Sequence, residues 1–136
     1  KDYCLFMIKE TYCKFCDYFC RYWDEDAKPV YQHVPGLQQD FRLTTLREFI
    51  GFAASAMLGR IAGDIPYPDY DDIDDYVARH NAKCYSIILN RQMLVKWEQY
   101  NTIDEFINDM RTVEDIYCRY AREYDEQQAQ KNLAGK

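Results

Sequence analysis

The sequence predicts an all-α protein in which about four main helices form one bundle. In four long segments, apolar residues recur at the three- and four-residue spacing of amphipathic helices. No segment alternates apolar and polar residues as a half-buried strand would. Prolines, glycines and threonine caps separate the four segments. At 136 residues, we expect a single helical domain over residues 1–125 and a polar, frayed tail over residues 126–136.

The first helix is expected from about Asp2 to Trp23. Its apolar positions follow helical spacing and are Leu5, Ile8, Tyr12, Phe15, Phe19 and Tyr22. An irregular stretch with Pro29 and the Pro35-Gly36 turn signal should follow. Thr45, with Glu48 three residues later, then predicts a capping box that opens the second helix.

Gly63 and the segment Pro66-Tyr67-Pro68 should close the second helix. Acidic residues then favour a helix start, and these are Asp69, Asp71 and Asp72. The third helix should carry Ile73, Val77, Cys84, Ile87, Ile88, Leu94 and Val95 and end at Asn101. Thr102 and Glu105 predict a second capping box. The fourth helix should carry Ile103, Phe106, Ile107, Met110, Val113, Tyr117 and Tyr120, and its pattern ends after Tyr124.

The segment from Phe49 to Gly63 is apolar on almost every side, which predicts a helix at the centre of the bundle. Small residues recur there every four positions, and these are Gly51, Ser55, Gly59 and Gly63. Glycine inside a helix costs about 0.5–1 kcal/mol relative to alanine. We therefore expect another helix or a ligand to approach this strip closely.

Arg60 is the one charged residue in that apolar segment. A guanidinium on a mostly buried helix must be paired, must reach solvent along its own stem, or must hold a ligand. Two interpretations follow for Arg60: a structural salt bridge with a carboxylate, or contact with an anionic or hydroxyl-rich ligand.

The composition argues against several classes of partner. The net charge is −6 and no dense block of Lys and Arg occurs, which argues against binding to nucleic acid or to an anionic membrane surface. The nearly apolar run from Phe49 to Gly59 is too short to span a bilayer. The six cysteines all fall within predicted helices, so we expect reduced thiols and a cytoplasmic location.

Two short patterns suggest chemistry but fit ordinary structure better. Cys13 and Cys16 have the spacing of a redox or zinc motif, yet they lie inside a helical pattern, which favours core packing. The acidic run from Asp69 to Asp75 lacks the glycine and glutamate of a calcium-binding loop, so a solvated helix start fits better. The residues contain no complete active site, and we assign no catalytic, cofactor-binding or metal-ligating residue.

Several blocks of the sequence, taken in order, resemble the C-terminal part of methylthioribose kinases, which are aminoglycoside-phosphotransferase-like kinases. These blocks are Glu10-Thr11-Tyr12 with Phe15, Phe19 and Trp23; Gly51-Phe52-Ala53 with Met57-Leu58-Gly59-Arg60-Ile61 and Gly63; and Arg91, Leu94 and Val95 with Thr102-Ile103-Asp104-Glu105. Together they cover residues 10–107. In the middle block, Arg60 matches one arginine of the family's twin-arginine motif, and Gly59 replaces the other.

The resemblance implies the C-terminal helical subdomain of a two-lobed, protein-kinase-like fold. It implies ATP and Mg²⁺ as cofactors of the full-length enzyme, and phosphate transfer to the 1-hydroxyl of methylthioribose in methionine salvage. The nucleotide lobe, the catalytic aspartate loop and the metal-binding acid would all precede Lys1. The chain would then form part of the sugar pocket through Arg60, contribute to a homodimer surface, and lack activity alone.

Two other classes of function stay open on the residues alone. The acidic face at residues 69–75 and the thirteen tyrosines would suit a non-enzymatic protein-interaction module, like an immunity or adaptor protein. A helical bundle with an aromatic-lined pocket for a small molecule is the third interpretation.

Overall fold

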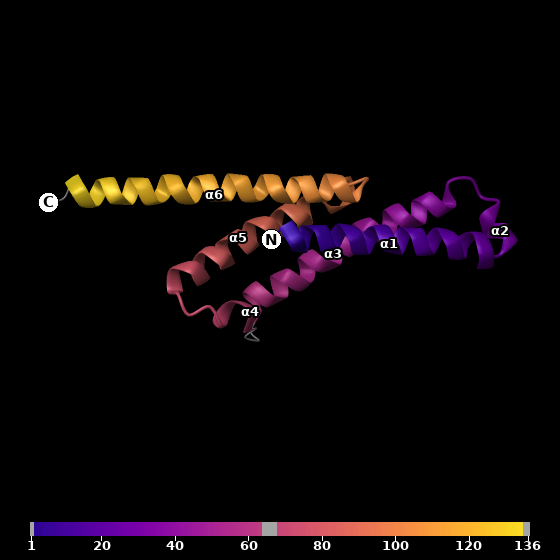
Figure 1. The fold of residues 1–136 in the computed structure, drawn as a ribbon, viewed down its shortest axis with the longest axis horizontal. Helices are drawn as coiled ribbons and strands as arrows, with labels where there is room; N and C mark the ends of the chain where they lie inside the picture. Colours follow the sequence, from indigo (N-terminus) through magenta and orange to yellow (C-terminus); the bar gives the residue numbers. More distant parts are fainter. Residues whose placement is uncertain (1, 64–67, 135–136) are drawn as a thin grey trace.

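A computed structural model describes residues 2–63 and 68–134 (Figure 1). The all-α prediction is confirmed, because these residues form helices and their connections, with no strand over the two described ranges. The elements are α1 (Asp2–Asp26), α2 (Pro29–Gln32), α3 (Leu37–Ala62), α4 (Pro68–Asp71), α5 (Tyr76–Lys96), the 3₁₀ turn η1 (Trp97–Gln99) and α6 (Ile103–Ala134).

The four long helices make an open bundle in which α3 packs most extensively against α5. Helix α6 packs on α5 and α1, and α1 also lies along α3. In Figure 1, α1 and α3 extend together toward the corner at α2, while the C-terminal part of α6 runs past the end of α5. The packed centre is therefore the place where α3, α5 and the first half of α6 meet.

The hydrophobic core lies at this meeting point. Its members are Leu46, Ile50, Ala54, Met93, Tyr100, Ile103, Phe106, Ile107 and Met110, all at most 6% exposed. The buried polar side chain beside them is that of Asn90, whose amide donates a hydrogen bond to the Ala54 carbonyl and so joins α5 to α3. That bond satisfies a polar group that would otherwise be costly to bury.

The second helix begins eight residues before the predicted start. Helix α3 starts at Leu37, directly after Gly36, which has a positive φ of 79° that suits glycine. Thr45 therefore lies inside the helix, and its hydroxyl donates a 2.8 Å hydrogen bond to the Phe41 carbonyl one turn earlier. The predicted capping box at Thr45 is wrong, because a threonine can bond back to its own helix as readily as it caps one.

The later helix starts are closer to prediction. The Asp75 side chain caps α5 by accepting hydrogen bonds from the amides of Val77 (2.8 Å) and Ala78 (3.0 Å), so Ile73 precedes the helix. At α6, the Glu105 amide donates a 3.1 Å bond to the Thr102 hydroxyl, which confirms the cap predicted there.

The backbone of α6 is helical through Ala134, well past the point where the apolar pattern ends. The helix thus takes in most of the tail expected over residues 126–136. The division of the chain into residues 1–125 and 126–136 stays a prediction. Residues 64–67, where Pro66 and Tyr67 were expected to end the second helix, lie outside the described residues, and Gly63 ends α3 as predicted.

Candidate functional site

The apolar segment that ends in Gly63 is central along only part of its length. Ile50 and Ala54 are fully buried, but Phe52 is 78% exposed and Leu58 is 42% exposed. The expectation of a wholly central helix is wrong, because Phe52 is exposed on α3 between the buried Ile50 and Ala54. Hydrophobicity on every side predicted burial on every side, and the tertiary packing covers one side only.

Arg60 lies in the last turn of α3, and its side chain is exposed. The expected burial of its guanidinium is therefore wrong. Because the side chain reaches solvent, its charge does not need a partner to offset the cost of burial. The position at a helix C-terminus is favourable for a positive charge. Its substrate-binding role stays a prediction.

The glycines of the small-residue strip lie in different surroundings. The Trp97 ring packs over Gly51, but an added Cβ would lie 3.5 Å from it, an ordinary van der Waals contact that does not require glycine. A Cβ added to Gly59 would meet nothing within 4 Å among the described residues. Gly63 caps the helix, and its amide donates a 2.9 Å hydrogen bond to the Gly59 carbonyl. An added Cβ at Gly63 would clash with the Gly59 carbonyl oxygen, so the geometry of the helix end, and not the approach of another helix, disfavours a side chain there.

A hollow of about 480 Å³ opens beside Gly51. It is lined by Glu48, Gly51, Phe52, Ser55, Leu94 and Trp97. The Ser55 hydroxyl donates a 3.0 Å bond to the Gly51 carbonyl, so it is already engaged within the helix. Aromatic faces beside one carboxylate can bind a small molecule. Ser55 donates to the Gly51 carbonyl and not to the Glu48 carboxylate, so these two residues do not form a pair of nucleophile and base.

An apolar depression in two parts, here called the α1–α3 groove, begins between α1 and α3 and continues to side chains of α5 and α6. One part, about 430 Å³, is lined by Met7, Ile8, Thr11, Tyr12, Phe15, Thr45 and Phe49. The adjoining part, about 230 Å³, is lined by Cys4, Leu5, Ile8, Phe49, Ala53, Met57, Tyr85, Leu89, Met93, Phe106, Met110 and Glu114. The two parts share Ile8 and Phe49, so they form one continuous surface.

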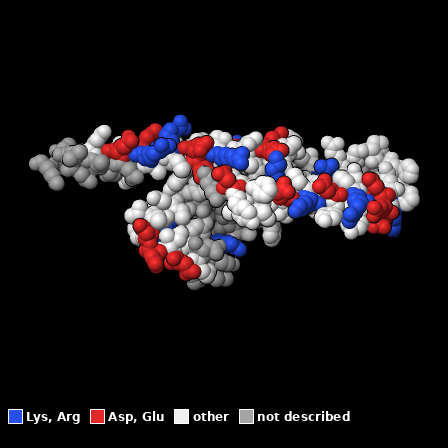
Figure 2. All heavy atoms as spheres, in the orientation of Figure 1, with Lys and Arg blue, Asp and Glu red and all other residues white. Residues whose placement is uncertain are grey.

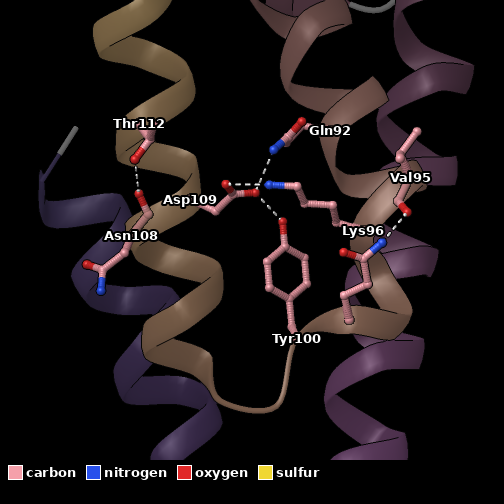
Figure 3. A network of polar contacts seen from close by, with 8 residues as sticks. Gln92, Val95, Lys96, Tyr100, Asn108, Asp109 and Thr112 are labelled. Carbon is pink, nitrogen blue, oxygen red and sulfur yellow. Dashed lines mark hydrogen bonds and ion pairs between the residues drawn. The ribbon is translucent and has the colours of Figure 1, made fainter.

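A polar network around Asp109 ties α6 to the last turns of α5 and to Tyr100, which follows η1 (Figure 3). The carboxylate accepts hydrogen bonds from the Tyr100 hydroxyl (2.5 Å) and the Gln92 amide (2.9 Å). The Lys96 ammonium donates a third hydrogen bond, of 3.0 Å, to the other oxygen of the Asp109 carboxylate. Figure 3 shows the three donors converging on one side chain from α5 and from the connection that follows it.

Burial and hydrogen bonding act in opposite directions on Asp109. Partial burial disfavours its charge, but the bonds from Tyr100, Gln92 and Lys96 outweigh burial and lower the pKa of the carboxyl. Burial, with the bond to Asp109, raises the pKa of Tyr100. The Asp109 carboxylate is therefore kept ionised by three donors from the same chain. This arrangement suits a structural role rather than that of a general base. Sequence reasoning missed this cluster because no motif links residues 92, 96, 100 and 109.

The two cysteines of the C-x-x-C pattern both lie inside α1, where Cys16 is buried and Cys13 is partly buried. Burial raises the pKa of the Cys13 thiol, which makes it less reactive. All six cysteines fall within the described residues, and each has a free thiol. The described residues contain no group of three or more His, Cys, Asp or Glu side chains that could hold a metal ion. Core packing therefore fits this pair, as the sequence indicated.

The acidic residues before α5 gather on the lobe that α4 and the start of α5 form (Figure 2). Asp75 caps α5, and the Asp71 carboxylate lies 3.1 Å from the Lys83 ammonium. The acidic run does contain the cap of α5, but that cap is Asp75. The helix start expected at Asp69, Asp71 and Asp72 is wrong, because Asp71 ends α4 and α5 begins at Tyr76. Use of this face by a protein partner stays a prediction.

Comparison with curated proteins identifies three methylthioribose kinases. The chain is 26% identical over 99 residues to that of Geobacillus thermodenitrificans strain NG80-2, a match that covers 73% of this chain and 25% of the relative. It is 25% identical over 104 residues to that of Klebsiella pneumoniae subsp. pneumoniae (76% and 26%). It is 29% identical over 98 residues to that of Geobacillus sp. strain WCH70 (72% and 24%). This chain resembles methylthioribose kinases.

The resemblance expected from the ordered sequence blocks is thereby confirmed. The chain spans about a quarter of the length of the curated relatives it matches. No family model matches the chain, and no solved structure matches it. Among the described helices, none combines the length and the hydropathy that a bilayer crossing requires.

Proposed function

We propose that this chain is the C-terminal helical part of a small-molecule kinase that phosphorylates methylthioribose or a closely similar sugar. The observation that carries the proposal is the identity of 25–29% to three methylthioribose kinases over about three quarters of this chain. The order of the matching blocks in residues 10–107 supports the same assignment. A cytoplasmic location and assembly as a homodimer belong to this proposal.

ATP and Mg²⁺ would be held outside this chain. The described residues offer no group of three side chains suited to a metal ion, and the sequence contains no glycine-rich phosphate loop. Phosphoryl transfer depends on positioning the phosphates and on neutralising their charge. Because this chain supplies neither function, it should not catalyse the reaction alone.

Arg60 would contribute to recognition of the acceptor sugar. Its exposed guanidinium, at the end of α3, could donate hydrogen bonds to sugar hydroxyls that another part of the enzyme positions. Its match to one arginine of the family motif supports this role. The role concerns binding of the acceptor and not the chemical step.

A kinetic comparison tests the proposal in the full-length protein that contains this chain. Arg60→Ala should raise the KM for methylthioribose by about tenfold or more, the cost of one hydrogen bond from a charged group. The KM for ATP should stay unchanged. Arg119→Ala is the matched control, because it removes another exposed arginine from α6.

Two results would overturn parts of the proposal. An unchanged KM for methylthioribose in Arg60→Ala would remove Arg60 from the sugar site. Absence of any phosphorylation of methylthioribose or of closely similar sugars by the full-length wild-type protein would reject the kinase assignment itself. Activity of residues 1–136 alone would contradict the division of roles proposed here.

A further inference from the structure

One thiol of the chain lies directly against an imidazole. On α5, the Cys84 Sγ atom lies 3.5 Å from His80 Nε2, which is within hydrogen-bonding distance for sulfur. The two residues are four positions apart, so the helix itself places them on one face. The other histidine of the chain, His33, has its ring nitrogen at the Pro29 carbonyl instead.

The surroundings of this pair leave it within reach of solvent. His80 is exposed and Cys84 is partly buried. The Tyr76 ring stacks on the His80 ring, with centroids 6.4 Å apart and an interplanar angle of 17°. Helix α6 covers the neighbouring turn, where the Tyr117 hydroxyl donates a 3.0 Å bond to the Asn81 carbonyl. A small reactant can therefore approach the pair from the side that α6 does not cover.

A thiol and an imidazole at this distance form a nucleophile with its own base. The thiolate is the reactive form of cysteine, and an adjacent imidazole produces it by taking the thiol proton. The resulting thiolate and imidazolium attract each other and are neutral as a pair. His80 thus gives Cys84 a proton acceptor on its own helix face.

The charges around the pair favour an uncharged reactant. The Lys83 ammonium, next to Cys84 in the chain, lies 3.1 Å from the Asp71 carboxylate and is already paired. Further exposed carboxylates precede α5 at Asp72 and Asp74. Negative charge of this kind repels anionic reactants. A small hydroperoxide carries no charge, and its oxygen is a common target of reactive thiolates.

We propose that Cys84 is a modification site at which His80 activates the thiol toward hydrogen peroxide. His80 takes the thiol proton, and the Cys84 sulfur attacks one peroxide oxygen. The S–O bond forms as the O–O bond breaks, and the leaving hydroxide takes the proton from His80 and departs as water. Cys84 is oxidised by two electrons to a sulfenic acid, and the peroxide is reduced. This inference is independent of the proposed kinase function.

A comparison of two cysteines in the wild-type protein tests the proposal directly. The full-length protein that contains this chain is treated with hydrogen peroxide and dimedone, which traps sulfenic acids, and mass spectrometry follows each peptide. Cys118 on α6 is more exposed than Cys84, so exposure alone predicts faster trapping at Cys118. Activation by a positioned base predicts the reverse order, with Cys84 at least about tenfold faster.

A pair of histidine variants tests the role of the base. His80→Gln removes the base at an exposed position and should lower trapping at Cys84 by about tenfold or more, without changing Cys118. His33→Gln is the matched control, because it removes the other histidine, whose ring contacts a backbone carbonyl. Its trapping at Cys84 should equal that of the wild type.

The possible outcomes each decide the inference. Trapping at Cys84 no faster than at Cys118 in the wild-type protein would overturn it, as would an unchanged rate at Cys84 in His80→Gln. An equal loss in His33→Gln would also overturn it, because it would show that the pair is not the cause. Fast trapping at Cys84 that depends on His80 would support the inference, whether or not the protein phosphorylates methylthioribose.

Discussion

Two faces of α3 lie in opposite environments. Near its middle, Ile50 is fully buried where α3 meets α5 and α6, and the network around Asp109 closes the same region. Two residues later, Phe52 is 78% exposed, and toward Arg60 the helix faces solvent. The closed corner, defined by the core cluster and Asp109, contrasts with the open surface formed by the α1–α3 groove and the last turns of α3.

This contrast shows that residue type alone does not decide burial in this protein. Phe106 is 4% exposed and Phe52 is 78% exposed, although both are phenylalanines on helices. The difference comes from the number of helices that reach each position. Stability should therefore depend on the closed corner, and binding to further chain or ligand should depend on the open surface.

The largest expected effect tests the core of the closed corner. Ile50→Ala should reduce the free energy of unfolding by about 2–5 kcal/mol, because it removes buried atoms and leaves a cavity. Phe52→Ala, on the open side of the same helix, should change it by less than about 0.5 kcal/mol. Urea denaturation of both variants measures the difference. Equal losses would contradict the contrast between the two regions.

The next effect tests the polar clamp of the corner. Asp109→Ala should cost about 1.5–3 kcal/mol, because it leaves the donors of Tyr100 and Gln92 without their charged acceptor. Asp71→Ala breaks a solvent-exposed pair with Lys83 and should cost about 0–1 kcal/mol. A loss at Asp109 no greater than that at Asp71 would show that the network contributes little.

The pH dependence gives an independent check on Asp109. Its pKa in the folded protein is lowered from the ordinary value of 3.8. The stability that the ionised carboxylate contributes to the folded state is therefore fully present above pH 3.8. The contribution is lost as the pH falls from 3.8 through the lower folded-state pKa. The stability difference between wild type and Asp109→Asn should therefore shrink in this acidic range. A difference that does not change with pH would contradict the lowered pKa.

A smaller effect compares two threonines that look alike in sequence. Thr102→Ala removes the hydroxyl that caps α6 and should cost about 0.5–2 kcal/mol. Thr45→Ala removes a hydroxyl that bonds within α3, and should change stability by less than about 0.5 kcal/mol. Thermal unfolding followed by circular dichroism distinguishes the two. A greater loss of stability in Thr45→Ala than in Thr102→Ala would indicate that Thr45 caps a helix.

The smallest effect concerns the open end of α3. Gly59→Ala should stabilise this chain by about 0.5–1 kcal/mol, since an added Cβ meets no described atom within 4 Å and alanine favours the helix. The melting temperature of residues 1–136 measures it. A loss of stability instead would show that the chain packs closely at Gly59 after all.

The fold was largely predictable because its signals are local. Apolar spacing placed four long helices, and Thr102 and Gly63 marked real helix ends. The error at Thr45 had a local cause too, since the same hydroxyl can bond forward to a cap or back into its own helix. The candidate site was harder to predict, because Arg60 was expected to be buried on the evidence of its apolar neighbours alone.

The Asp109 network could not be predicted from the sequence, because no local pattern links its members. Its donors come from α5 and from Tyr100, and they meet only because η1 turns the chain back toward α6. Such convergence depends on helix orientation, which leaves no periodic signal.

The sequence by itself determined that this protein is helical, that α3 ends at Gly63 and Thr102 caps α6, and that the chain resembles methylthioribose kinases. These properties follow from spacing, capping and residue order along the chain. Only the tertiary structure decided that Ile50 is enclosed while Phe52 and Arg60 are exposed, and that apolar side chains of α1 and α3 line an open groove. The physical reason is that burial depends on which distant helices cover a position, and a helix's own sequence specifies only what it could bury.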